Sequence, residues 1–288
     1  MTRVFISQDL RPEWTESNAL SMAFALQGEV FRKMPGRCTM QVPIKGRTCF
    51  VKLHYGVGLA EFLKNLLQFK WPVIGAENEY RACLKLEQIG IWAPRVLAYA
   101  SGSGVLWQRR SFVLTDALQD FVTLEDVGLS WQRNYPSPSA KRAWLVSVAE
   151  FARRFHAQGF VHRDFYLCHL LAPAAVANHS PSGGADLGVL DLHRALLFSP
   201  GSVPDKWLER DMAALLFSAL ELGYTQRDWL RFLSIYAGRP WRAELKARGR
   251  FWRRVWMRAH YLYDRGKRKG LVQGTYRPSP FGGQRSYR

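Results

Sequence analysis

Residues 160–171, FVHRDFYLCHLL, bring together side chains that could transfer protons or bind a metal: His162, Arg163, Asp164, Cys168 and His169. Three interpretations are open: a catalytic loop, a metal site, or a structural segment whose polar side chains have no chemical role. The two histidines and the cysteine lack the spacing of zinc ligands, which argues against a zinc site. The choice between the other two depends on which reactive residues the rest of the chain supplies.

Asp164 stands in the tripeptide His-Arg-Asp, which protein kinases carry in their catalytic loop. Phosphate transfer from ATP requires a group that orients the acceptor hydroxyl, cations near the phosphates and ligands for a metal. We expect Asp164 to accept or orient the proton of the acceptor hydroxyl. His169, five residues later, occupies the place of the metal-binding asparagine. Imidazole can ligate a divalent metal, although nitrogen is a softer donor than magnesium prefers.

A second aspartate, Asp191, opens the sequence DLHR at the end of the short apolar segment 187–191, where a strand is expected. Protein kinases place here the aspartate that holds magnesium against the β- and γ-phosphates, so we expect Asp191 to be a metal ligand. The preceding segment 172–186, rich in Pro, Ser and Gly, is typical of a loop insertion. Asp211, at the start of the following helix, is expected to accept hydrogen bonds from backbone N–H groups of the catalytic loop.

The lysine for the nucleotide phosphates is expected at Lys52, within the alternating segment RTCFVKLHY. Its carboxylate partner should lie one helix later, at Glu79, with Glu77 as the second choice. Thr115 and Ala117 are further candidates for nucleotide binding.

The sequence contains no GxGxxG motif in the region that would cover the phosphates. The corresponding turn is expected at MPGRC, residues 34–38, which has one glycine and one arginine.

The elements that must position these residues are strands in the first part of the chain and helices in the second. Alternating apolar residues predict a strand over 47–55, entered through a Lys45-Gly46 turn, and two further strands are expected over 96–100 and 111–116. Apolar residues at helical spacing predict helices over 59–67, 77–88, 139–159 and 212–220, and Thr225 is expected to cap another. The predicted class is α+β, a protein-kinase-like bilobal fold with a β-rich N-terminal nucleotide-binding lobe (1–117), a helical C-terminal catalytic lobe (118–265) and a basic flexible tail (266–288).

Composition indicates a globular protein, with 48% apolar and 14% aromatic residues among 288. Its four cysteines show no paired spacing, which favours a reducing compartment in which each is a small buried residue. No apolar run reaches the roughly 18 to 20 residues that cross a bilayer. We therefore expect a cytoplasmic protein, soluble or peripheral on a membrane.

The net charge of +18 is concentrated near the end of the chain, where residues 241–288 hold 14 Lys and Arg against two acids. Such a surplus favours an anionic partner: phosphate-rich lipid, nucleic acid or an acidic protein. Trp241, Trp252 and Trp256 lie among these charges, and the mixture of tryptophan and arginine favours an anionic membrane surface.

These motifs resemble those of the lipopolysaccharide core heptose kinases of Gram-negative bacteria. The matching segments lie between residues 25 and 240: QGEVFR (27–32), FVKLHYG (50–56), KNLLQFKWPVIGAENEY (64–80), HRDFYLCHLL (162–171), VLDLHRA (189–195) and LGYTQRDWLRFL (222–233). The combination of HRDxYxCH with DLHRA is specific, since ordinary protein kinases carry neither form.

The resemblance implies ATP-dependent phosphorylation of a heptose in the lipopolysaccharide inner core, at the cytoplasmic face of the inner membrane. It implies Asp164 as the catalytic aspartate, His169 and Asp191 as metal ligands, and Lys52 and Glu79 as the nucleotide pair. The implied cofactors are ATP and Mg²⁺, with Mn²⁺ as an alternative. The implied acceptor is the inner-core glycolipid, and an acidic protein is a further candidate partner.

Other functions remain open. The protein could be a kinase for another core sugar or for a protein, although no APE-type ending or phosphorylation site of an activation loop is evident after Asp191. It could also be a non-catalytic kinase-like binding module, which the presence of Lys52, Asp164 and Asp191 argues against. Nucleic-acid binding rests on the net charge alone and is not expected.

Overall fold

The structure, a computed structural model, describes residues 3–56, 75–103, 105, 109–131, 133–177, 187–270 and 272. The chain divides into two compact units, one of Met1–Gln119 with Val189–Leu196 and one of Asp120–Gly188 with Leu197–Arg288. Strands dominate the first unit and helices the second, so the predicted α+β class is confirmed. The helix predicted over 59–67 lies outside the described residues.

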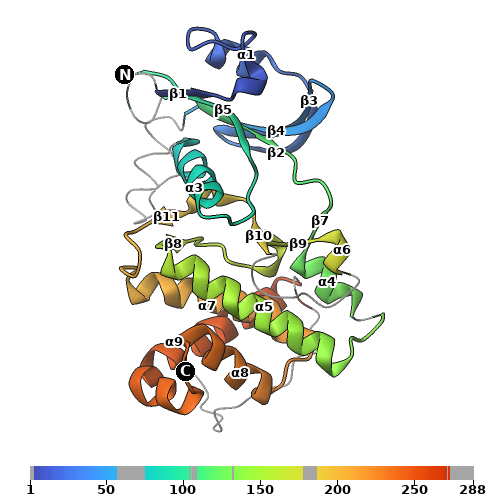
Figure 1. Cartoon of the computed structure of the whole chain (residues 1–288), viewed down its shortest axis with the longest axis vertical. Coiled ribbons are helices and arrows are strands. Elements are labelled where there is room, and N and C mark those ends of the chain that lie inside the picture. The colour runs from blue at the N-terminus through green and yellow to red at the C-terminus, as the bar shows by residue number, and fades with distance from the viewer. Residues whose placement is uncertain are drawn as a thin grey trace. The chain divides into compact units, whose positions relative to one another are not determined.

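The first unit is built on a six-stranded antiparallel sheet in the order β1-β5-β6-β4-β3-β2 (Figure 1). Its strands are β1 (Arg3–Ile6), β2 (Glu29–Met34), β3 (Arg37–Ile44), β4 (Arg47–His54), β5 (Val96–Ser101) and β6 (Ser111–Asp116). The three predicted strands are β4, β5 and β6. The predicted Lys45-Gly46 turn joins β3 to β4, and both of its residues have positive φ, as tight hairpin turns require.

Successive side chains of strand β4 alternate between two faces, of which one is mainly apolar and the other carries Thr48, Phe50, Lys52 and His54. Cys49, Val51 and Leu53 are buried in an apolar core that also includes residues of α1 (Ala19–Ala25). Lys52 lies on the opposite face. The same unit contains η1 (Gln8–Leu10), α3 (Glu77–Gln88), whose bounds agree with the prediction, and η4 (Leu192–Arg194), which contacts α3.

The second unit consists mainly of α4 (Leu124–Ser130), α5 (Pro138–Ala157), α7 (Asp205–Ala219), α8 (Gln226–Ala237) and α9 (Trp241–Arg268). Shorter elements are β7 (Phe121–Thr123), β8 (Phe160–Val161), η2 (Leu167–His169), β9 (Leu170–Pro173), α6 (Ala174–Ala177) and η5 (Leu220–Leu222). The strand expected over 187–191 is reduced to β10 (Gly188–Val189), and β11 (Leu196–Leu197) follows η4.

Helix starts in the second unit follow their local signals. The Ser137 hydroxyl accepts a hydrogen bond from the Ala140 N–H group and Pro138 opens α5, one residue before the predicted start. Thr225 and Asp228 form the predicted capping box at the start of α8. Helix α7 begins at Asp205, seven residues before the predicted start at Met212. The prediction started too late because the first two turns of the helix are mostly polar and show no regular apolar pattern.

A cluster of stacked aromatic rings lies beneath residues 160–165. Phe155 of α5 packs with a ring-centroid distance of 5.1 Å to Phe160 and 5.4 Å to Phe165, and all three side chains are fully buried. Phe165 directly follows Asp164, so its burial anchors the chain beside this aspartate.

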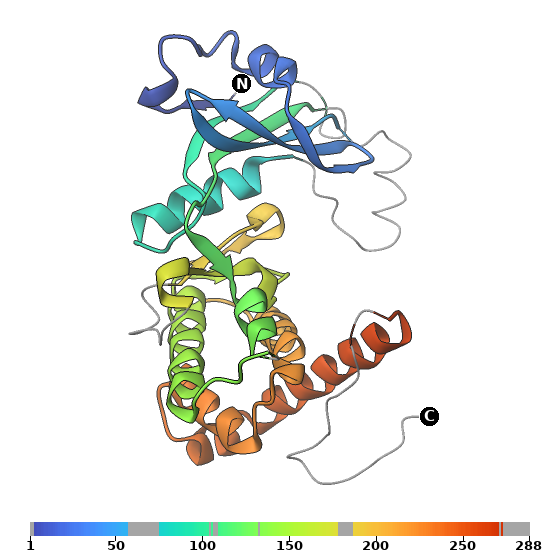
Figure 2. The same cartoon turned by 90° about the vertical axis from the view of Figure 1, so that its right-hand side faces the viewer.

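The basic C-terminal region contains a 28-residue helix, α9, that sequence patterning did not predict (Figure 2). It packs against α7 and α8, has non-helical dihedral angles at Arg248, and continues to Arg268, three residues into the predicted tail. Its buried side chains beyond Arg248 recur every three or four residues, so the helical period was present in the sequence: they are Phe251, Trp252, Val255, Ala259, Tyr263 and Gly266.

Two expectations about buried side chains were wrong. Trp252, one of the three tryptophans taken as favouring a membrane surface, is fully buried and donates a hydrogen bond from its indole nitrogen to Glu244 Oε1 at 2.8 Å, while Trp241 and Trp256 are half-buried. Of the four cysteines, all free, Cys168 is only half-buried because Leu167 is the residue of η2 that enters the core.

Candidate active site

Three charged side chains from distant parts of the chain meet in the first unit. Lys52 Nζ of β4 lies 2.7 Å from Glu79 Oε1 of α3 and 2.9 Å from Asp191 Oδ1. The predicted pairing of Lys52 with Glu79 is thus present. Glu77, the second choice, instead forms an ion pair with Arg3 at a more exposed position.

Lys52 and Asp191 of this cluster are held in their ionised forms. Burial by itself would lower the pKa of Lys52, but the two carboxylates outweigh it and raise that pKa above its usual range. Burial would likewise raise the pKa of Asp191, but the hydrogen bond from His193 and the charge of Lys52 hold it well below its usual range. Glu79 is almost fully buried, so its charge depends on Lys52 for compensation.

Asp191 has a left-handed backbone, with φ 60° and ψ 52°. Non-glycine residues in this region are uncommon and are often found at functional sites, where the surroundings enforce the conformation. Two residues later, His193 Nδ1 lies 2.8 Å from Asp191 Oδ1. Sequence reasoning gave His193 no role, although it stands in the DLHR motif.

A second histidine that the sequence did not point to, His54, lies at the end of β4. Its side chain is 3% exposed, and no described residue forms a hydrogen bond with its Nε2 atom. Burial, together with the positive charges of Arg37 and Lys52, lowers the pKa of His54 to about 3. His54 is therefore neutral at physiological pH.

In the second unit, a buried carboxylate fixes the backbone next to Asp164. Asp211 of α7 is fully buried and accepts hydrogen bonds from the N–H groups of His162 at 2.7 Å and Arg163 at 2.8 Å. Arg163 has a φ of 71°, a left-handed conformation that these two bonds stabilise. The role predicted for Asp211 is confirmed.

The side chains of His162 and His169 are oriented by the backbone of Asp164. His169 Nδ1 lies 2.7 Å from the Asp164 carbonyl oxygen, which can only accept, so Nδ1 carries a proton. In a neutral ring, Nε2 is then the nitrogen that could ligate a metal. The ring of His162 stacks on that of His169, with centroids 5.4 Å apart, and its Nδ1 accepts a bond from the Asp164 N–H group.

Residues 22–236 match the lipopolysaccharide kinase (Kdo/WaaP) family. The chain belongs to this family. It is therefore a phosphotransferase, a kinase of the lipopolysaccharide core. The family predicted from the sequence is confirmed.

Named relatives cover almost the whole chain. The lipopolysaccharide core heptose(I) kinase WaaP of Pseudomonas aeruginosa is 36% identical over 270 residues, covering 93% of this chain and 98% of the relative. The enzyme of the same name from Escherichia coli K12 is 33% identical over 272 residues, covering 93% and 100%. A solved structure of WaaP in complex with acyl carrier protein matches with a TM-score of 0.75 and 32% identity, covering 91% of this chain and 99% of that one.

The side chains of this lipopolysaccharide kinase suit a metal that arrives with the nucleotide. Among the residues that the structure describes, no group of three or more His, Cys, Asp or Glu side chains could hold a metal ion. Magnesium bound to ATP needs only one or two carboxylates, because phosphates and waters supply its other oxygen ligands. Ionised Asp191 fits that requirement.

The remaining nucleotide candidates lie on β6 and just after it. The Thr115 side chain is buried, with its hydroxyl 3.5 Å from the Phe50 carbonyl oxygen. The N–H group of Ala117 donates to the Thr48 carbonyl oxygen at 3.0 Å, so this donor is already used within the first unit. The MPGRC segment forms the turn between β2 and β3, with Gly36 at positive φ. Nucleotide contacts at these residues remain predictions.

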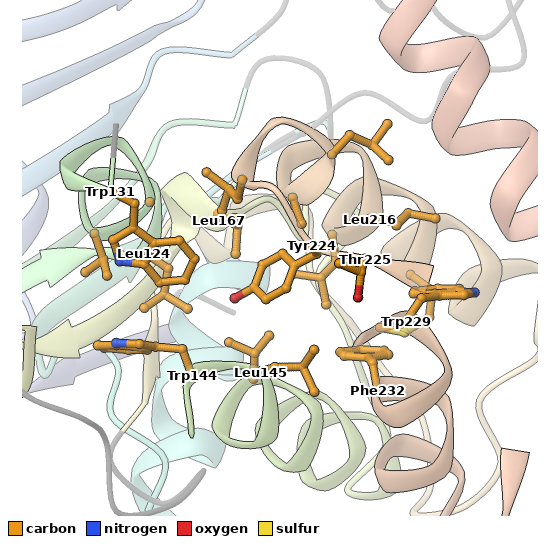
Figure 3. Close-up of a pocket in the computed structure, with 18 of the residues that line it drawn as sticks. Leu124, Trp131, Trp144, Leu145, Leu167, Leu216, Tyr224, Thr225, Trp229 and Phe232 are labelled. Atoms are coloured by element: carbon orange, nitrogen blue, oxygen red, sulfur yellow. The ribbon is translucent and has the colours of Figure 1, made fainter. Parts of the chain in front are cut away.

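A large apolar cavity of about 260 Å³ lies within the second unit, among α4, α5, α7 and α8 (Figure 3). Trp131 and Trp144 lie at one end of it, Trp229 and Phe232 at the other, and Tyr224 between them. None of the described residues that line it carries a charged side chain. A cavity needs only roughly 10–15 Å³ of such volume to hold one water molecule, so this cavity is far larger than a packing defect.

The buried His54 predicts a specific dependence of stability on pH. Unfolded histidine has a pKa of about 6.5. Below that pH the unfolded chain gains a proton at His54 that the folded chain does not, until the folded value of about 3 is approached. We expect this group to lower the free energy of unfolding by up to about 1.4 kcal/mol per pH unit as the pH falls through this window.

Urea unfolding of the wild type and His54→Leu at pH 8, 6, 5 and 4.5 would measure this contribution. At pH 8 His54 is neutral in both states, so the difference there gives the packing effect of the substitution alone. The variant should lose less stability than the wild type below pH 6.5. Identical slopes for the two proteins would show that His54 is not buried in its neutral form.

Proposed function

We propose that this chain transfers the γ-phosphate of ATP to a hydroxyl group of heptose I in the lipopolysaccharide inner core. The Lys52–Glu79–Asp191 cluster is the observation that carries the proposal, because kinases bind nucleotide phosphates with a lysine paired to a helix glutamate and a nearby metal-binding aspartate. The heptose acceptor is supported by the name that the P. aeruginosa and E. coli relatives share.

In the first unit, Lys52 binds the inner phosphates of ATP and Glu79 holds the lysine in place. Asp191 would hold magnesium, and the metal would supply positive charge to the nucleotide phosphates. The contact between Lys52 and Asp191 would then weaken, because the lysine would turn to the phosphates and the aspartate to the metal. Thr115 and Ala117 are proposed to contact the nucleotide by van der Waals packing.

In the second unit, Asp164 receives the proton of the heptose hydroxyl. The oxygen of that hydroxyl forms a bond to the γ-phosphorus, while the bond from this phosphorus to the β–γ bridging oxygen breaks. ADP leaves with the electron pair of that bond. His169 is proposed as a second metal ligand through Nε2, and Asp211 keeps the loop in the conformation that presents Asp164.

Replacing Asp164 by Asn should reduce kcat by at least about 100-fold, because general-base assistance is commonly worth 10²- to 10⁴-fold. Phosphate transfer from labelled ATP to purified rough lipopolysaccharide measures this. Asp120→Asn is the matched control, since Asp120 is exposed and its left-handed backbone suits asparagine.

Full activity of Asp164→Asn would contradict the role of this residue. A wild-type protein that shows no magnesium-dependent transfer to rough lipopolysaccharide would overturn the proposed function and favour a binding module.

We further propose that the protein acts at the cytoplasmic face of the inner membrane, held there by one face of α9. No helix among the described residues is long and apolar enough to cross a bilayer. Beyond Arg248, exposed side chains recur every three or four residues along one face of α9. This basic face consists of Arg250, Arg254, Met257, Arg258, Tyr261, Arg265 and Arg268.

The composition of the basic face suits an anionic lipid surface. Met257 and Tyr261 are 43% and 58% exposed and lie between arginines, so apolar side chains could enter the headgroup region while the charges meet lipid phosphates. Arg254 also forms an ion pair with Glu209, which reduces its contribution.

Charge reversal on this face should release the protein from anionic vesicles. Each arginine near such a surface contributes about 1 kcal/mol, so Arg258→Glu with Arg265→Glu should weaken binding by about 100-fold or more. Sedimentation with phosphatidylcholine vesicles, with and without phosphatidylglycerol, measures this. Arg142→Glu with Arg227→Glu makes the same change in net charge on exposed parts of α5 and α8. This control should lose much less of its affinity for anionic vesicles. An equal loss in both double variants would show that only net charge matters.

We also propose that this chain binds an acyl carrier protein and receives its acyl chain in the apolar cavity. The structural relative in complex with acyl carrier protein supports the partner. The size of the cavity and its apolar lining support a hydrocarbon ligand, since every methylene moved from water into such a site contributes about 0.8 kcal/mol.

Filling the cavity should remove the preference for an acylated carrier. We expect the wild type to bind acyl carrier protein loaded with a long acyl chain at least about tenfold more tightly than the unacylated form. Ala219→Phe, which adds a ring at the cavity wall, should bind both forms equally, whereas Ala243→Phe on an exposed part of α9 should keep the preference. Calorimetric titration measures both affinities, and equal affinities in the wild type would contradict the proposal.

A further inference from the structure

The orientation of the Asp191 carboxylate depends on contacts of its side chain. Asp191 precedes η4 in a left-handed backbone conformation, and its side chain makes no capping bond to that helix. Its Oδ1 atom is instead contacted by Lys52 Nζ at 2.9 Å and His193 Nδ1 at 2.8 Å. Two donors on one carboxylate oxygen fix the rotation of the whole group.

The two donors differ in how firmly they can hold the Asp191 carboxylate. Lys52 reaches Asp191 on a flexible four-carbon stem, also contacts Glu79, and is the residue that nucleotide phosphates would attract. His193 lies in the same short turn as Asp191 and is 9% exposed, so its ring has little freedom. A carboxylate oxygen only accepts, so Nδ1 of His193 carries the proton of this hydrogen bond.

The identity of this residue sets the chain apart from protein kinases. Their Asp-Phe-Gly motif has glycine, which has no side chain, two residues after the metal-binding aspartate. Here that place holds His193, and the turn that carries it packs against α3, the helix that supplies Glu79. A side chain thus supports the aspartate where protein kinases have none.

We propose that His193 is a positioning residue that holds the Asp191 carboxylate, through its Nδ1–H group, in the orientation that binds the nucleotide's metal. The inference rests on the proposed role of Asp191. It resembles the support that metal ligands commonly receive from hydrogen-bonded neighbours, whose loss weakens metal affinity by 10- to 100-fold.

The test compares three substitutions at one position. His193→Phe keeps a ring and removes the donor. His193→Asn places an amide nitrogen at the same number of bonds from Cβ as Nδ1, whereas His193→Gln places it one bond farther, near the position of Nε2. His260→Phe, in α9 of the second unit, is the control for loss of a partly buried histidine.

The first measurement is equilibrium binding of Mn²⁺ to each protein with a non-hydrolysable ATP analogue, followed by electron paramagnetic resonance. We expect His193→Phe to raise the dissociation constant for Mn²⁺ by 10- to 100-fold, which is the usual effect of losing such a partner. His193→Asn should stay within about threefold of the wild type, His193→Gln should resemble His193→Phe, and His260→Phe should be unchanged.

The second measurement is phosphate transfer to rough lipopolysaccharide as a function of Mg²⁺ concentration. The Mg²⁺ concentration for half-maximal activity should rise in the same order as the Mn²⁺ dissociation constants, while KM for lipopolysaccharide stays constant. A merely structural role would lower the amount of folded protein without moving this metal dependence.

Two outcomes would overturn the proposal: Mn²⁺ affinity of His193→Phe equal to that of the wild type, or no difference between His193→Asn and His193→Gln. If His193→Phe does not fold, the Mn²⁺ affinities of His193→Asn and His193→Gln decide whether the proposal holds. Failure of the proposed function is distinct, because it appears as an absence of transfer by the wild type.

Discussion

The ammonium group of Lys52 joins segments that are far apart in the sequence, and the geometry of the first unit depends on it. Its hydrogen bonds connect β4 with α3 and, across 139 residues, with Asp191. Each carboxylate would be costly to bury without the lysine, and the lysine without them. The three groups therefore require each other, and their contact helps to explain why Val189–Leu196 belongs to the first unit although the chain on both sides belongs to the second.

The two units hold their key aspartates by different physical means. Asp191 is oriented by two side-chain donors, of which Lys52 can exchange its contact for nucleotide phosphates while His193 stays in place. Asp164 is positioned through its backbone, because Asp211 binds the two preceding N–H groups and Phe165 is packed into the aromatic core. The first arrangement suits a binding site that must respond to charge, and the second suits a loop that must keep its shape.

Charge and apolar surface are also separated within the second unit. The basic face of α9 lies opposite the side chains, such as Trp252 and Val255, that enter the core. The apolar cavity lies among the other helices and has no charged lining residue among those described. Such a unit can be attracted to anionic partners over a long range and gain affinity from hydrocarbon burial at close contact, which fits both partners proposed for it.

Local signals in the sequence were sufficient for much of the framework. The alternation in β4 identified Lys52 and its apolar neighbours, the capping box at Thr225 identified the start of α8, and the order of the reactive residues indicated a kinase. The hydrogen bonds of Asp211 to the loop were anticipated, although Asp211 lies in the second turn of α7 and not at the helix start where the sequence placed it. These features depend on residues that are neighbours in the chain, or on periods of two and 3.6 residues.

The long-range contacts required the tertiary structure. The hydrogen bonds of Lys52 join it to residues 27 and 139 positions away, and the local bond of His193 to Asp191 accompanies a left-handed backbone at Asp191. The burial of His54, the apolar cavity and the inward side of α9 are results of packing, and a tryptophan among arginines gives the same pattern whether it faces a membrane or a core. The sequence by itself determined the family and the succession of a strand-rich part and a helical part, and it indicated which residues are expected to react. Only the tertiary structure decided which of these residues touch and which are buried, because those properties depend on segments brought together from distant parts of the chain.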